Sequence, residues 1–171
     1  MKKIKKYSLW LMPTGNIYNK LNKIISQLNK EYSSPNFLPH VTLIGLVVGS
    51  QKEILLKTSQ LAIFIQPFEI KLTKVDYLNE YFRCLFIKVV KTKELMEANL
   101  KAREIFNREK DLKFMPHLSL MYGNFNSKTK KGVISKIGRE FNLKFKVKSI
   151  HLFLTEGESK RWYKIKKFVL K

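Results

Sequence analysis

The spacing of apolar residues divides the chain into alternating helix-like and strand-like segments. Residues three and four apart share one face of a helix, whereas residues two apart share one face of a strand. Helical spacing of apolar residues predicts helices over 17–28, 53–64 and 95–106, with a weaker one over 127–138. Short apolar or alternating runs predict strands over 7–12, 37–48, 68–76, 81–90, 114–122, 141–147, 150–155 and 162–169, the third and fourth forming a hairpin.

These segments follow one another without a linker, a low-complexity tract or a break in composition. A chain of 171 residues with 44% hydrophobic residues and 12 phenylalanines can fill one sizeable core. We therefore predict one domain over residues 1–171, of the α+β class, that combines helices with a largely antiparallel sheet.

The net charge of the chain bears on the kind of ligand and not on the predicted fold. The chain carries 34 Lys and Arg against 13 Asp and Glu, a net charge of +21, which would attract phosphates and other polyanions. Lysine-rich composition is also typical of proteins from AT-biased genomes, so the charge fits a nucleotide or RNA ligand without requiring one. No run of eighteen apolar residues occurs, and we expect a soluble, cytoplasmic, monomeric protein that does not contact a membrane.

The single cysteine limits redox and metal chemistry. One thiol excludes an internal disulfide and a thiolate metal cluster. Because Cys84 lies directly before the apolar run Leu85-Phe86-Ile87, we predict a buried, inert side chain.

The most informative feature is an internal repeat. Residues 37–43 read Phe-Leu-Pro-His-Val-Thr-Leu, and residues 114–120 read Phe-Met-Pro-His-Leu-Ser-Leu. The two copies match in chemical character at every position, and they contain two of the three histidines in the chain. In a strand, His40 shares a face with Thr42, and His117 shares a face with Ser119. If the two strands lie side by side, or are related by a pseudo-two-fold axis, all four side chains line one cleft.

This set of groups matches the needs of cyclic-phosphate hydrolysis. Water must lose a proton to a base, the departing ribose oxygen must gain one from an acid, and the phosphoryl oxygens need donors. An imidazole titrates near pH 6.5, so one of a pair can be neutral while the other is protonated. We assign His117 as the base and His40 as the acid, with Thr42 and Ser119 holding the phosphate, although the near-symmetry of the motifs also permits the reverse.

Other interpretations of the histidines are weaker. One histidine on an apolar strand is usually a satisfied core residue, but a duplicated His-x-Thr/Ser favours function. Neither motif has a carboxylate or a cysteine at ligand spacing, and two histidines alone rarely hold zinc, so we predict no metal. His151 lacks a hydroxyl two residues on and is interpreted as an ordinary strand residue near the surface.

At the repeat the sequence resembles the two-histidine phosphoesterase superfamily, and within it the plant and yeast type of cyclic phosphodiesterase. The resemblance extends to 7–13, which looks like that family's opening strand, to 81–86, which looks like its central strand, and to 114–123. It implies the bilobal, LigT-like fold, with two pseudo-symmetric lobes around a central cleft. It also implies no metal or other cofactor.

The resemblance further implies hydrolysis of nucleoside 2′,3′-cyclic phosphates to 2′-phosphates and action on ADP-ribose 1″,2″-cyclic phosphate, a reaction set that belongs to RNA metabolism and tRNA splicing. It makes His40, Thr42, His117 and Ser119 the catalytic quartet, and it makes Trp10 and Tyr122 substrate-binding candidates. Strict alternation would turn Tyr122 away from the cleft unless the strand bends near Gly123, and Trp10 could equally belong to the core.

Two alternatives stay open at this point. The same basic cleft could serve a phosphodiesterase directed at RNA ends, or a module that binds an RNA terminus without turnover. The sequence does not choose among a mononucleotide, an ADP-ribose derivative and an RNA terminus as the ligand.

Overall fold

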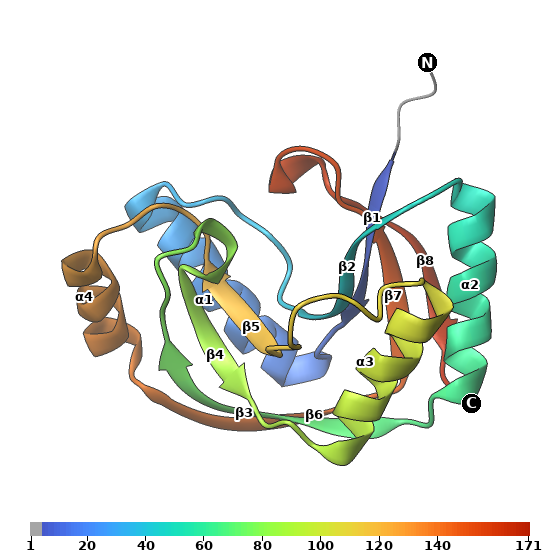
Figure 1. Ribbon diagram of the computed structural model, residues 1–171. Helices are drawn as coiled ribbons and strands as arrows, with labels where there is room; N and C mark the ends of the chain where they lie inside the picture. Colours follow the sequence, from blue (N-terminus) through green and yellow to red (C-terminus); the bar gives the residue numbers. More distant parts are fainter. Residues whose placement is uncertain (1–4) are drawn as a thin grey trace.

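The alternating segments of the chain form one strongly bent antiparallel sheet with helices on its outer sides. The computed structural model describes residues 5–171, and in this part of the chain it contains eight strands in the order β6-β3-β4-β5-β2-β1-β7-β8 (Figure 1). The strands are β1 (Lys6–Leu11), β2 (Val41–Val48), β3 (Phe68–Asp76), β4 (Leu85–Val89), β5 (His117–Met121), β6 (Glu140–Val147), β7 (Ser149–Leu154) and β8 (Tyr163–Val169). The helices are α1 (Gly15–Tyr32), α2 (Gln51–Phe64), α3 (Lys93–Ile105) and α4 (Ser127–Ile137).

The sheet consists of two four-stranded halves that meet at a narrow seam. Strands β6, β3, β4 and β5 form one half, and β2, β1, β7 and β8 form the other. Within the described residues, β2 and β5 are registered through one pair, Val41 with Leu118. Each of these residues directly follows a histidine of the repeat. The seam therefore runs through both copies of the motif, as a pseudo-two-fold arrangement requires.

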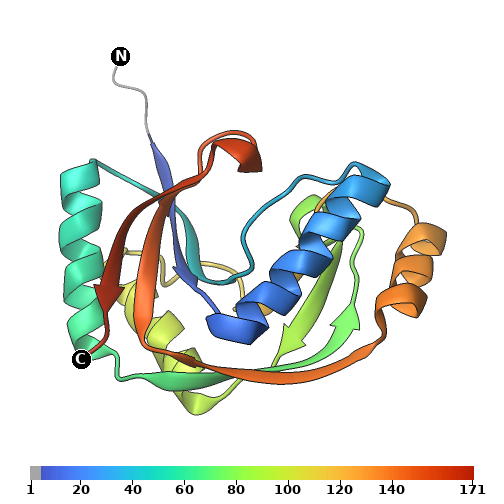
Figure 2. The same cartoon turned by 180° about the vertical axis from the view of Figure 1, so that it is seen from behind.

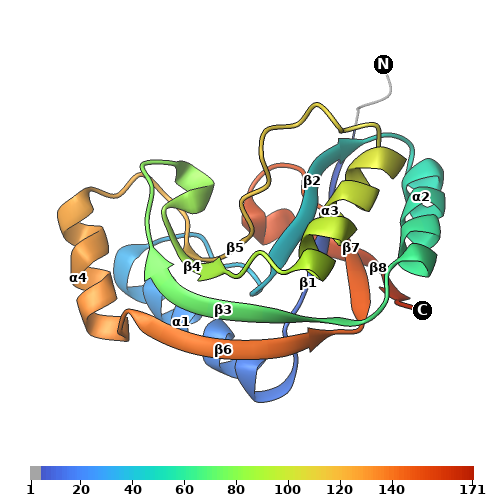
Figure 3. The same ribbon diagram turned by 60° about the horizontal axis from the view of Figure 1, so that its bottom comes forward.

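The chain crosses between the halves more than once. Figure 3 shows β3 and β6 side by side along one edge of the molecule, and only Lys148 separates the end of β6 from the start of β7 in the other half. Such crossings make the two lobes interdependent, because the half formed by β2, β1, β7 and β8 is built from two stretches of chain that flank the continuous stretch from β3 to β6.

Each lobe is covered by its own pair of helices (Figure 2). Helices α1 and α4 lie on the lobe of β5, where α1 packs on β5, while α3 packs on β2 and α2 packs on β7 and β8. Three helices begin at a side-chain cap: Ser50, Thr92 and Asn126 accept hydrogen bonds from backbone N–H groups three residues on. These caps satisfy amide groups that a helix leaves unpaired at its start.

The boundaries predicted from the sequence are wrong where proline or a tight turn intervenes. Strand β2 begins at Val41 and β5 at His117, several residues later than predicted, because Pro39 and Pro116 have no N–H for a sheet ladder. The segment 81–83 is a short 3₁₀ helix rather than part of a strand. Both motif histidines consequently lie at the start of a strand, where the chain leaves a loop.

Two other predictions concern single residues. Cys84 is fully buried, as predicted, and burial raises the pKa of its thiol. His151 lies half-buried on β7, where Ser149 Oγ is 3.1 Å from its Nε2 and its Nδ1 is buried without a partner. Burial and the charges of Lys164 and Lys167 lower the pKa of His151 to about 4. Within the described residues, no helix is both long and apolar enough to cross a membrane.

Candidate active site

The two copies of the motif open into one cavity of about 360 Å³. His40, Thr42, His117 and Ser119 all line it, which fits the shared face predicted from residue spacing. Extending the Val41–Leu118 register by one residue in each direction places His40 opposite Ser119 and Thr42 opposite His117. The antiparallel seam thus gathers two imidazoles and two hydroxyls that are 77 residues apart in the sequence.

The same backbone contact orients both imidazole rings. His40 Nδ1 donates to the carbonyl oxygen of Leu38 at 2.6 Å, and His117 Nδ1 donates to that of Met115 at 2.8 Å. Because a carbonyl oxygen only accepts, each Nδ1 carries its proton, and each Nε2 of a neutral ring is left with a free lone pair. The residue between carbonyl and histidine is proline in both copies, which restrains the preceding backbone to an extended shape.

His40 is held in a tight aromatic setting. Its ring stacks on the indole of Trp10, with 3.6 Å between ring centroids and an interplanar angle of 8°, and meets Phe37 edge-on. Only 6% of the residue is exposed. Burial is the main reason that the pKa of His40 is lowered to about 3, and the charge of His117 adds to it. His40 is therefore neutral in the free protein at neutral pH.

His117 is more open to charged neighbours. It is partly buried and meets the edge of Phe86 at 5.4 Å between ring centroids. Burial and the positive charge of Arg83 lower its pKa, while Glu80 acts in the opposite direction. Arg83 and Glu80 are themselves joined, with Nε 2.7 Å from Oε2. The two charges beside His117 therefore oppose each other in their effect on its pKa, with that of Arg83 the larger, and burial lowers the pKa of His117 less than it lowers that of His40.

The two hydroxyls of the motif differ in their hydrogen bonds. Ser119 Oγ donates to the backbone carbonyl of Phe82 at 2.9 Å. Among the described residues, Thr42 Oγ1 has no hydrogen-bond partner, and Thr42 is only half-buried. The threonine can therefore donate directly to a ligand, whereas the serine must first turn away from the Phe82 carbonyl.

Trp10 lies at the wall of the cavity but offers it little free surface. It is 2% exposed, because its rings lie between His40 on one side and Phe153 on the other, with 3.9 Å between the Trp10 and Phe153 ring centroids. The sequence left open whether Trp10 shapes the pocket or belongs to the core. In the structure it does both, since it lines the cavity and packs against the ring of His40.

Tyr122 reaches the cavity because β5 carries an irregularity. Leu85 pairs with Met121, but the next residue, Phe86, pairs with Ser119, so Leu120 is an extra residue on β5. A bulge of this kind shifts the alternation of side chains by one position. Tyr122 therefore lines the same cavity as Ser119, and it stacks on Phe37 with 3.8 Å between ring centroids. Burial raises the pKa of its phenol far above the usual value.

Several cavity residues were missed in the sequence. Phe82 lies on the 3₁₀ segment 81–83, Trp162 directly follows the 3₁₀ segment 159–161, and their ring centroids lie 6.2 Å apart. Trp162 Nε1 donates to the Gly157 carbonyl at 3.1 Å, which holds the loop before β8. Ser8 also lines the cavity and is bonded to Thr155, with 2.9 Å between the hydroxyl oxygens. A polar residue in the apolar run 7–11, two positions before Trp10, was a usable signal for Ser8.

The chemistry of the cavity is that of an imidazole and hydroxyl site. Within residues 5–171, no group of three or more His, Cys, Asp and Glu side chains is arranged so that it could hold a metal ion. The base, acid and hydrogen-bond donors that phosphoester chemistry needs are nevertheless present in the motif side chains.

A family model for "cyclic phosphodiesterase-like protein" matches residues 6–170. The chain belongs to this family. The match confirms the resemblance to the two-histidine phosphoesterases, and membership makes the chain a phosphodiesterase.

Two relatives agree with this family. A "cyclic phosphodiesterase" of Arabidopsis thaliana is 26% identical over 166 residues, which covers 94% of this chain and 92% of the relative. A "2′,3′-cyclic-nucleotide 3′-phosphodiesterase" of Yarrowia lipolytica is 34% identical over 107 residues, which covers 58% of this chain and 50% of the relative.

Solved structures share the fold. A phosphoesterase crystal structure superposes with a TM-score of 0.69 at 15% identity, and Escherichia coli LigT complexed with 3′-AMP superposes with a TM-score of 0.68 at 15% identity. Each comparison covers 99% of both chains. The predicted bilobal, LigT-like α+β fold is confirmed.

Proposed function

We propose that the chain hydrolyses ribose cyclic phosphates, taking a nucleoside 2′,3′-cyclic phosphate to the 2′-phosphate without a metal ion. The observation that carries this proposal is the pairing of Val41 with Leu118, which brings both His-x-hydroxyl motifs into one cavity. The names of the two relatives, both phosphodiesterases for cyclic phosphates, support it.

The difference in protonation between the histidines gives each a role. His40, with its pKa lowered to about 3, acts as the base: its Nε2 takes a proton from water as the water oxygen attacks phosphorus. The bond from phosphorus to the ribose 3′-oxygen breaks, and His117 gives its Nε2 proton to that oxygen. These roles are the reverse of those predicted from the sequence, in which His117 was the base and His40 the acid.

The populations of the protonation states favour His40 as the base and His117 as the acid. A productive enzyme needs its base neutral and its acid protonated at the same pH. With the more deeply buried His40 as base, that form dominates between the two pKa values. With His40 as acid, it would be a minor species at every pH.

The hydroxyls hold the phosphate. Thr42 donates to one non-bridging oxygen, and Ser119 donates to the other after turning from the Phe82 carbonyl. Donors placed where charge develops in the transition state are worth about 10²- to 10³-fold in kcat each. The nucleoside next to the reacting phosphate lies against Phe82, Tyr122 and Trp162, whose rings surround the cavity.

This function is tested by incubating the EDTA-treated protein with adenosine 2′,3′-cyclic phosphate and separating the products by chromatography. We expect 2′-AMP to form at a rate that added metal does not raise. Formation of 3′-AMP would overturn the assignment of the broken bond, and loss of turnover with EDTA would overturn the metal-independent mechanism.

A further inference from the structure

The turn between β3 and β4, residues 78–83, forms part of the wall of the catalytic cavity. Its Phe82 ring lines the cavity and meets the ring of Tyr122 edge-on, with 5.2 Å between centroids. The Trp162 ring lies 6.2 Å from that of Phe82, again between centroids. In the proposed function these three rings receive the nucleoside. The position of the turn therefore decides where one of the three rings stands.

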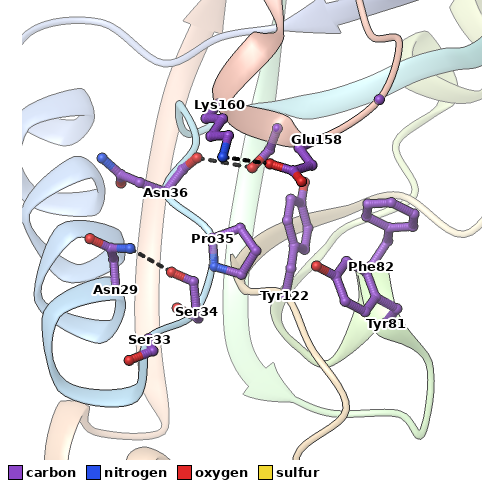
Figure 4. Close-up of a pocket in the computed structure, with 12 residues that line it drawn as sticks. Asn29, Ser33, Ser34, Pro35, Asn36, Tyr81, Phe82, Tyr122, Glu158 and Lys160 are labelled. Atoms are coloured by element: carbon purple, nitrogen blue, oxygen red, sulfur yellow. Dashed lines mark hydrogen bonds and ion pairs between the residues drawn. The ribbon is translucent and has the colours of Figure 1, made fainter.

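Burial of its own side chains does not anchor this turn. Tyr81 is 42% exposed and Phe82 is 54% exposed, and none of the residues in the 3₁₀ segment 81–83 is buried. Figure 4 shows both rings grouped with that of Tyr122 at one side of an adjoining cavity. A segment with few buried apolar contacts is prone to local opening, so the position of the turn depends on its hydrogen bonds.

The end of the turn that faces the cavity is attached to β5 and to the residues after it. The Gly123 N–H donates to the Tyr81 carbonyl at 3.0 Å. Ser119 Oγ donates to the Phe82 carbonyl at 2.9 Å. These two bonds hold the end of the turn and leave its start, at Leu78, to another attachment.

The start of the turn is attached to α4 through Lys130. Lys130 Nζ donates to the Leu78 carbonyl and to Asn79 Oδ1, each at 2.9 Å. The same Nζ lies 5.1 Å from the centre of the Tyr77 ring. The Leu78 N–H donates to the Arg83 carbonyl at 3.0 Å, which closes the turn on itself. One ammonium group thus ties the start of the turn to a helix, and the closing hydrogen bond carries that constraint to its end.

Lys130 is buried to an unusual degree for a lysine. It is 1% exposed, and the residues that α4 buries are Lys130 and Val133. Its partners are a carbonyl, an amide and an aromatic face, all of them neutral groups. Burying a charge is costly, and an apolar residue of similar volume often gives equal or greater stability. The buried ammonium group is therefore better explained by the turn that it holds than by the packing of α4.

We propose that Lys130 is a positioning residue for recognition of the nucleoside: its ammonium group holds the 78–83 turn so that the Phe82 ring stands against the base of the substrate. Lys130 is not among the described residues that line the catalytic cavity, so it acts through the turn. Recognition groups act best when they are held within about 0.5 Å of their productive geometry. This inference rests on the proposed function, which places the nucleoside at Phe82.

The experiment measures kcat and KM of Lys130→Met on two substrates: adenosine 2′,3′-cyclic phosphate, and a methyl ribofuranoside 2,3-cyclic phosphate, which has no base. Methionine has a similar length and lacks the ammonium group. We expect KM for the adenosine substrate to rise by about tenfold, in the lower part of the range that stacking of one base confers. Kinetics on the base-free substrate should change far less. A lysine that served only the stability of the fold would not alter the preference between the two substrates.

Matched variants separate the attachment of the turn from a loss of stability or of charge. Thr58→Val removes a buried hydroxyl of α2 that donates to the Ile54 carbonyl at 2.7 Å. Lys136→Met removes an exposed charge from the same helix as Lys130. Both variants should keep the wild-type KM on both substrates.

Variants of Asn79 change the attachment and keep the charge of Lys130. Asn79→Ala should raise KM for the adenosine substrate by less than Lys130→Met does, because Nζ keeps its bond to the Leu78 carbonyl. Asn79→Asp retains an acceptor oxygen and should retain the wild-type KM. Because Asn79 is exposed, its variants test the inference even where Lys130→Met does not fold.

A double variant tests whether the effect passes through the Phe82 ring. In Phe82→Ala protein the base has no ring to stack on at this position, so adding Lys130→Met should raise KM little further. A KM rise as large as in the wild-type background would overturn the inference, because the effect would then bypass the ring.

The remaining outcomes separate the two proposals. An unchanged substrate preference in folded Lys130→Met, or in Asn79→Ala where Lys130→Met does not fold, would overturn the inference and leave the proposed function standing. Absence of turnover by the wild-type protein on the adenosine substrate would contradict the proposed function, and the inference would fall with it.

Discussion

The two copies of the motif share their backbone geometry but differ in their surroundings. In both, the imidazole Nδ1 donates to the carbonyl two residues before it. The His40 copy adds a flat stack on Trp10 and near-complete burial, whereas the His117 copy has Glu80 and Arg83 nearby and is only partly buried. The repeated sequence thus sets the tautomer twice, and the unrepeated neighbours set two different proton affinities.

This comparison explains how a symmetric pair can perform an asymmetric reaction. Hydrolysis needs a base and an acid at once, and two identical histidines would hold those states together in only a fraction of molecules. Unequal burial pushes the two pKa values apart, which is a general way to assign acid and base roles. The two hydroxyls also differ from each other, because Ser119 donates a hydrogen bond to the Phe82 carbonyl, whereas Thr42 has no hydrogen bond to a described residue.

The largest expected effect comes from removing either imidazole. His40→Ala and His117→Ala should each lower kcat on a 2′,3′-cyclic nucleotide by about 10² to 10⁴-fold, because each removes one proton transfer. His151→Ala is the matched control and should keep the wild-type rate, since His151 lies on β7 outside the catalytic cavity. Steady-state kinetics on folded variants checks this, and a wild-type rate for either motif variant would refute the paired mechanism.

Removal of the two hydroxyls should affect kcat and KM differently. Thr42→Val should lower kcat by about 10²- to 10³-fold with little change in KM, because a free donor to the phosphate is lost. Ser119→Ala should lower kcat and also change KM, because it releases the Phe82 carbonyl that holds part of the cavity wall. Identical kcat and KM changes in the two variants would show that the hydroxyls are equivalent after all.

The pH profile tests the proton assignment. The dependence of kcat/KM should be bell-shaped with its optimum below pH 6.5, because both histidine pKa values are lowered in the free protein. Rate should be lost on the acid side as His40 becomes protonated and on the alkaline side as His117 becomes neutral. Trp10→Leu should hydrate His40 and raise its pKa, which moves the acid limb to higher pH. NMR titration of the two rings should find His40 the harder to protonate.

The smallest effect concerns a surface charge. Glu80→Gln should shift the alkaline limb to lower pH, because Glu80 raises the pKa of His117 and its loss leaves Arg83 unopposed. The shift should be small, since Glu80 is about half exposed and solvent weakens such interactions. Glu31→Gln, which breaks an ion pair with Lys136 on other elements, should leave the profile in place.

Much of this site could be predicted from the repeat, for a physical reason. Residues two apart in a strand share a face, so the spacing of His40 and Thr42, and of His117 and Ser119, was enough to place each pair on one wall. The helical spacings likewise located α1 to α4 within a few residues. These are local rules, and they depend little on what the distant chain does.

The rest depended on contacts between distant segments. The placement of Tyr122 follows from the bulge at Leu120, which only the pairing of β4 with β5 reveals. The unequal pKa values of the histidines follow chiefly from unequal burial, to which the packing of Trp10 on His40 contributes, and not from the near-identical motifs. Phe82 lies on one short 3₁₀ segment and Trp162 directly follows another, and the conformation of such segments has no periodic signal in the sequence.

The central claim is that the two motifs act as one acid–base pair, and a double variant tests it most directly. The measurement is kcat on adenosine 2′,3′-cyclic phosphate for His40→Ala, His117→Ala and the combined variant. Groups that act as a unit show strongly non-additive losses. We therefore predict that kcat of the double variant is only slightly lower than kcat of the less active single variant. Losses that multiply, with the double variant slower by the product of the two single effects, would contradict a shared mechanism.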